Sequence, residues 1–72
     1  MDAVVQEKMI RILKGELKYT SSNLAFNMMI AKLQKRLKSD PACIEACIGE
    51  LEGFLAKYPI VAKVDLANIV AL

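Results

Sequence analysis

The chain of 72 residues contains no histidine and no tryptophan, and it has only two cysteines and three glycines. Histidine is the side chain most often used for general acid–base catalysis at neutral pH and the commonest metal ligand, so its absence removes both uses. Two cysteines do not complete a tetrahedral zinc site, and no glycine-rich phosphate-binding loop is present. Because every usual catalytic role lacks a positioned candidate, we expect no enzymatic activity, no catalytic, cofactor-binding or metal-binding residue, and no cofactor.

The net charge and the hydrophobic runs are both modest. The formal charge of +2 is too small to indicate a partner. The first residues lack the basic region of a signal peptide, and the longest apolar-rich segment, 60–72, is interrupted by Lys63, Asp65 and Asn68. A membrane-spanning helix needs about 20 predominantly apolar residues. We therefore expect a soluble, cytoplasmic protein that makes no membrane contact.

Apolar residues are abundant for so small a chain. They make up 56% of it, whereas about 45–50% is usual for soluble domains. A chain of this length forms one domain near the lower limit at which a single core suffices, so little of the excess can be hidden inside it. Surplus apolar surface on a small protein most often marks an association face. The composition thus predicts a single helical domain over residues 1–72 that forms a homodimer or binds a protein partner.

The spacing of apolar residues predicts three helices, over about 2–17, 22–38 and 41–57. Asp2 can cap the first helix. Asp40 followed by Pro41 is a typical helix start, because the N–H that proline lacks would have no helical partner at that position. The connection between the second and third helices is short, so these two helices should form an antiparallel hairpin.

Residues 59–72 carry mixed signals. Valine and isoleucine favour a strand, but the chain offers no second strand for it to pair with. We therefore predict a fourth, shorter helix that begins at Pro59 and is capped again at Asp65. The predicted fold class is all-α, a small three- to four-helix bundle that contains the antiparallel helical hairpin.

The predicted helix 22–38 is apolar on nearly all of its sides. Eight of the ten residues from Leu24 to Leu33 are apolar, whereas a surface helix shows one apolar stripe. This pattern predicts that other helices, from the same chain or from a second copy, enclose it. The predicted core comprises Ile12, Leu13, Phe26, Ile30, Leu33, Leu37, Ile44, Ile48, Leu51 and Leu55.

The two cysteines, Cys43 and Cys47, stand four residues apart on the predicted helix 41–57. In a regular helix the Cβ atoms of such a pair lie roughly 5–6 Å apart, which strains a disulfide that needs about 3.8 Å. We therefore expect both to serve as small buried apolar residues.

The leading functional hypothesis is a non-enzymatic protein-interaction or oligomerisation module that buries an apolar helix face. Such a module would carry its partner or dimer face on the second and third helices and on the tail. The residues predicted for this face are Met28, Met29, Phe54, Val61, Ile69 and Leu72.

The alternative hypothesis is a small DNA- or RNA-associated regulator. The C-terminal end of helix 22–38 is basic, and no acidic residue occurs from residue 21 to residue 38. Four cations at this end would supply the phosphate contacts. Two simpler explanations compete with this one, because helix C-termini favour cations and the glutamates of helix 41–57 can face them across the hairpin. The candidate nucleic-acid contacts are Lys32, Lys35, Arg36 and Lys38.

Overall fold

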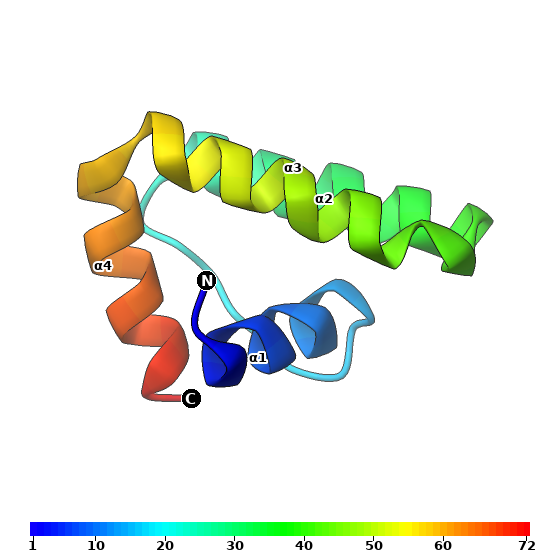
Figure 1. Cartoon of the computed structure of the whole chain (residues 1–72), viewed down its shortest axis with the longest axis horizontal. Coiled ribbons are helices and arrows are strands. Elements are labelled where there is room, and N and C mark those ends of the chain that lie inside the picture. Colours follow the sequence, from blue (N-terminus) through cyan, green and yellow to red (C-terminus); the bar gives the residue numbers. More distant parts are fainter.

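A computed structural model describes all 72 residues, and it is all-α. Helices α2 and α3 lie antiparallel and side by side, α1 packs beneath them, and α4 crosses one end of the pair (Figure 1). The predicted bundle with its antiparallel hairpin is confirmed. The elements are α1 (Ala3–Leu13), α2 (Leu24–Ser39), the 3-10 turn η1 (Pro41–Cys43), α3 (Ile44–Lys57) and α4 (Pro59–Val70).

Helix α1 is shorter than predicted because of Gly15. The Asp2 carboxylate caps its first turn by accepting from the Val4 N–H at 2.8 Å. Gly15 has a φ of +78°, in the left-handed region that glycine adopts without steric cost. The Glu16 N–H donates to the Arg11 carbonyl at 2.8 Å, and the Gly15 N–H donates to the Ile12 carbonyl at 3.0 Å. These two bonds are the Schellman motif that ends a helix. The prediction that this helix continues to residue 17 was wrong.

Helix α2 begins at a network of polar side chains. The Asn23 carboxamide accepts from the Phe26 N–H at 3.0 Å, so Asn23 is the N-cap and the helix starts two residues later than predicted. The Ser21 hydroxyl accepts from the Asn23 N–H, and the Asn27 side chain both donates to and accepts from the Ser21 backbone. These bonds satisfy the backbone of the 14–23 loop where it enters the bundle.

The Asp40-Pro41 start was predicted correctly, but the first turn after it is a 3-10 turn. The Asp40 carboxylate accepts from the Ala42 N–H at 3.2 Å, and the Cys43 N–H donates to the Asp40 carbonyl at 3.1 Å. Regular α-helix begins only at Ile44. Tight turns of this kind are frequent at helix N-termini.

The tail forms one continuous helix, α4, with Pro59 at its first position, as predicted. The expectation of a second cap at Asp65 was wrong. Asp65 lies inside the helix, is only 1% exposed, and accepts a hydrogen bond from the Tyr19 hydroxyl of the 14–23 loop. The Asp65 carboxylate therefore binds Tyr19, which is distant in the sequence, instead of capping a helix.

The core lies between α1, one side of α2, α3 and the end of α4. Nine of the ten predicted core residues are buried, and Ile44 is partly buried. Four further buried residues complete it: Val5, Met9, Cys47 and Ile69. Helices of the same chain do not enclose α2 on all sides, because Leu24 is 73% and Met28 is 65% exposed on its outer side. Enclosure of that side by a second copy stays a prediction.

Candidate functional site

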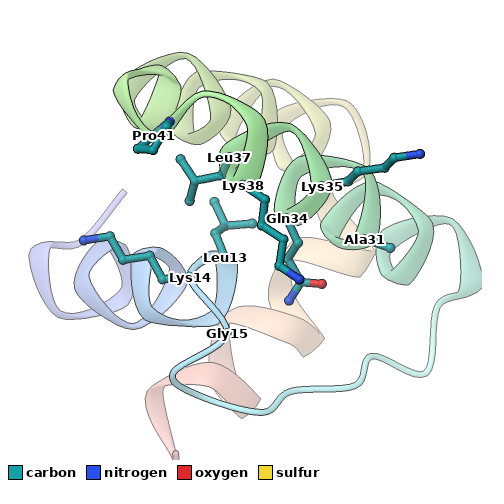
Figure 2. Close-up of a pocket in the computed structure, with 9 residues that line it drawn as sticks. All are labelled: Leu13, Lys14, Gly15, Ala31, Gln34, Lys35, Leu37, Lys38 and Pro41. Atoms are coloured by element: carbon teal, nitrogen blue, oxygen red, sulfur yellow. The ribbon is translucent and has the colours of Figure 1, made fainter.

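A pocket of about 520 Å³ lies between the end of α1 and the C-terminal half of α2 (Figure 2). Its size falls in the range of sites for small molecules or large side chains. We call it the lysine-rimmed pocket. Its lining residues are Leu13, Lys14, Gly15, Ala31, Gln34, Lys35, Leu37, Lys38 and Pro41.

The pocket exists because α1 stops early. The hairpin of α2 and α3 extends beyond the end of α1, so the last turns of α2 have no helix beneath them (Figure 1). The Gly15 turn bends the chain away at this point. Gln34 joins α2 to α1 at the pocket, because its side-chain N–H donates to the Ile12 carbonyl at 3.0 Å.

The charges around the pocket are all positive. Lys14, Lys35 and Lys38 belong to its lining, and no acidic residue does. The ion pairs of the chain join Arg11 to Glu16, Arg36 to Glu50 and the N-terminal amine to Glu52, so none uses these lysines. Lys38 lies beside Gln34, whereas Lys14 and Lys35 extend outward on either side (Figure 2). The site is thus an apolar basin with three cations at its rim, suited to a ligand that is part apolar and part anionic.

An exposed apolar stripe on α2 leads into this pocket. Leu24, Met28 and Ala31 follow one another at spacings of four and three residues, which places them on one side of the helix. Lys35 continues the same line four residues further on. Because Ala31 and Lys35 also line the pocket, the stripe and the pocket form one continuous surface.

The residues predicted for a partner face are scattered by the fold. Met28 and Leu72 are exposed, at 65% and 46%, but they lie on α2 and at the C-terminus. Met29, Phe54 and Val61 are partly buried against the core, and Phe54 stacks on Phe26 with ring centroids 5.6 Å apart. Ile69 is fully buried in the core and is not on the surface at all.

Two strongly exposed apolar residues were not predicted as part of this face. Leu24 is 73% and Ile60 is 81% exposed. The helical spacing of Leu24 and Met28 was a usable signal for the first. Ile60 and Val64 border a smaller hollow of about 180 Å³ beside Ser22 and Asn23, and no local pattern indicated that neighbourhood.

The four predicted basic contacts point to different sides of α2. Lys35 and Lys38 line the pocket. Arg36 faces α3 and pairs with Glu50 at 2.7 Å, the cross-hairpin arrangement considered above. Lys32 is exposed and does not line the pocket. Lys14 joins Lys35 and Lys38 only through the fold, because it comes from the C-terminal cap of α1.

A buried polar contact holds the 14–23 loop onto α4. The Tyr19 hydroxyl donates to the Asp65 carboxylate. Burial, followed by the hydrogen bond to Asp65, raises the pKa of Tyr19 from 10.0 to about 12. The tyrosine therefore remains a neutral donor throughout the physiological range, which suits a structural role.

The cysteine pair is reduced, with Cys47 fully buried and Cys43 half-buried. Their Sγ atoms lie 3.5 Å apart. Burial, and then the hydrogen bond with Cys43, raises the pKa of Cys47. No group of three or more cysteine, aspartate or glutamate side chains gathers anywhere in the chain in a way that would hold a metal ion.

Comparison with protein-family models, with curated proteins and with solved structures yielded no match. None of the four α-helices combines the length and the apolar character required to cross a membrane.

Proposed function

We propose that the protein is a non-enzymatic interaction module whose α2 surface binds an acidic amphipathic segment of another protein. The observation that carries this proposal is the continuity of the exposed stripe of Leu24, Met28 and Ala31 with the lysine-rimmed pocket. A partner segment would lay apolar side chains along the stripe and place carboxylates among Lys35 and Lys38.

The apolar half of the surface supplies the binding free energy. Leu24 and Met28 leave 73% and 65% of their surface in water. Full burial of a side chain of this size is worth about 1.5–3 kcal/mol, so covering both favours association by a few kcal/mol before ordering costs. Residues three and four apart on one helix are the usual anchors for a helix or strand laid across it.

The basic half of the surface supplies selectivity for acidic partners. The negative ends of the α1 and α2 dipoles favour cations here, which accounts for the lysines gathering at this place. Because the lining contains no acid, the ammonium groups of Lys14, Lys35 and Lys38 stay open to carboxylates from outside. Charge pairs of this kind mainly set partner choice and association rate.

Two other occupants compete with this proposal. Nucleic acid is disfavoured because Arg36 is held by Glu50 and Lys32 lies off the pocket, so the cations do not form one row for a phosphate backbone. A second copy of the chain would cover the apolar stripe with the same stripe, but it would bring the lysines of both copies to the interface with no acid on that helix.

The test is an NMR titration of the full chain with two synthetic helical peptides. Both carry leucine on one face, and their other face is glutamate in the first and lysine in the second. We expect the glutamate peptide to shift amide signals along α2 and around Gly15, with little effect from the lysine peptide. Met28→Glu and the double change Lys35→Gln with Lys38→Gln should each weaken binding at least several-fold. Lys63→Gln is the matched control, because Lys63 is exposed on α4, which contributes nothing to the pocket.

Three results would overturn the proposal. The first is equal binding of the two peptides, or no binding of either. The second is tighter, steeply salt-dependent binding of a random DNA duplex, which would favour the nucleic-acid hypothesis. The third is a dimer in sedimentation equilibrium at micromolar concentration that Met28→Glu dissociates, which would assign the stripe to a second copy.

A further inference from the structure

The two thiols stand at the junction between η1 and α3. Cys43 ends the 3-10 turn and is half-buried, while Cys47 lies one turn into α3 and is fully buried. Their sulfur atoms are 3.5 Å apart, so each is the other's hydrogen-bond partner. No other cysteine exists in the chain to compete for either.

The backbone at Cys43 departs from the regular helix for which a disulfide between residues four apart is strained. Cys43 has φ −86° and ψ +14°, outside α-helical values, and it precedes the first α-helical residue, Ile44. Its turn is held by its own N–H on the Asp40 carbonyl and by the Asp40 carboxylate on the Ala42 N–H. Cys43 is the N-cap of α3, so its side chain is attached where the helix begins and not in its interior.

We propose that Cys43 and Cys47 form an intrachain redox site that closes to a disulfide when the protein meets a peroxide. Cys43 is the attacking residue, because its sulfur belongs to a residue that solvent reaches. Cys47 is the resolving residue, because it is shielded from solvent and already in contact with the Cys43 sulfur. The raised pKa of Cys47 agrees with this division, because a buried thiol that keeps its proton is a poor first nucleophile.

The reaction balances in two steps. The Cys43 thiolate attacks one peroxide oxygen, the O–O bond breaks, and a sulfenic acid forms as water leaves with the proton of the thiol. The Cys47 sulfur then attacks the Cys43 sulfur, the S–O bond breaks, and hydroxide leaves and takes the Cys47 proton as water. Two thiols are oxidised to one disulfide, and one peroxide is reduced to two waters.

The test exposes the folded full chain to a small excess of hydrogen peroxide, then alkylates the remaining thiols and measures the intact mass. We expect loss of two hydrogens per chain, no alkylation, and full reversal by dithiothreitol. The same chain unfolded in urea is the control, and the folded chain should close faster because its sulfurs are held together. In Cys47→Ala the reaction should stop at a sulfenic acid that dimedone traps, and in Cys43→Ser the remaining thiol should resist peroxide.

Several outcomes would overturn the proposal. One is a folded chain that keeps both thiols under conditions that oxidise the unfolded chain. Another is closure no faster in the folded than in the unfolded chain, and a third is a disulfide that joins two chains instead of closing within one. Because the wild-type comparison decides these outcomes, the proposal stays testable even if Cys47→Ala, a change in the core, fails to fold.

Discussion

The hydroxyl of Tyr19 donates to the carboxylate of Asp65, and this contact ties the longest loop of the chain to the middle of its last helix. Asp65 is 1% exposed, and no other side chain donates to it. A buried carboxylate without a donor is costly, so the loop and the helix depend on one another. The pair is a structural feature of the fold, and neither residue lines the lysine-rimmed pocket on α1 and α2.

Removing the donor of this pair should destabilise the protein. In Tyr19→Phe the Asp65 carboxylate loses its hydrogen-bond partner, and we expect a loss of about 1–3 kcal/mol in the free energy of unfolding, measured by urea denaturation. Tyr58→Phe is the matched control, since Tyr58 is 44% exposed and its hydroxyl makes no hydrogen bond. An equal effect of both substitutions would contradict a special role for the Tyr19–Asp65 contact.

The same pair predicts a pH dependence at the alkaline end. The folded protein holds the Tyr19 proton up to a pKa of about 12, whereas the unfolded chain releases it near 10.0. The contribution of this group is therefore fully present below pH 10 and is lost as the pH rises toward 12. The difference in urea midpoint between wild type and Tyr19→Phe should shrink across this window, and a difference that stays constant would rule the linkage out. Subtracting the variant removes the titration of the lysines, which both proteins share.

The glycines should respond to alanine in opposite directions. Gly15→Ala places a Cβ in the left-handed region, where it costs about 1–2 kcal/mol, although the surroundings leave room for it. Gly49 and Gly53 lie inside α3 and face open space where a Cβ would stand, so alanine at either should stabilise the protein by about 0.5–1 kcal/mol. Thermal unfolding of the three variants measures the loss of stability at Gly15 and the gains at Gly49 and Gly53. Stabilisation by Gly15→Ala would contradict the Schellman closure of α1.

The two sides of α2 should differ sharply when the same substitution is made on each. Leu33 is fully buried, and Leu33→Ala should cost about 2–5 kcal/mol, enough to unfold a domain this small. Leu24 is 73% exposed, and Leu24→Ala should change the stability by less than about 0.5 kcal/mol. Circular dichroism with urea titration compares them. A large loss from Leu24→Ala that grows with protein concentration would mean that a second copy covers the stripe.

The ion pair across the hairpin should contribute little. Arg36 and Glu50 approach to 2.7 Å, but their side chains are 44% and 40% exposed. Exposed pairs of this kind are worth about 0.2–1 kcal/mol. A double-mutant cycle with Arg36→Gln and Glu50→Gln should give a coupling energy within that range, reduced by added salt. A coupling well above it, or one insensitive to salt, would show that the pair is desolvated.

Much of the helical architecture could be predicted from local residues. Asp2, Asp40 and Pro59 mark helix starts, because capping and the missing proline N–H act within one turn of the chain. The core positions of α2 and α3 followed from helical periodicity, since one side of each helix must face the other. The boundary at Gly15 was missed because glycine inside a helix and glycine that ends one look alike in sequence.

The candidate site could not be predicted in the same way. Lys14 lines the same pocket as Lys35 and Lys38 only because α1 ends beside the C-terminal half of α2. Because α2 is apolar on nearly all sides, the sequence did not indicate that its Leu24 side lies open to solvent. Nor did it indicate that Ile69 of α4 is buried in the core, and Ile69 was predicted on a partner face. These are outcomes of packing between distant segments, and composition records only the total of apolar residues.

Local sequence alone determined that this chain is helical, where its hairpin turns, and which stripes of α2 and α3 form the core. The tertiary structure alone decided that Tyr19 rather than a helix end meets Asp65, and that three lysines share one pocket. The reason is physical. Capping and periodicity act over one or two helical turns, whereas a pocket or a buried polar pair depends on where separate helices end relative to one another.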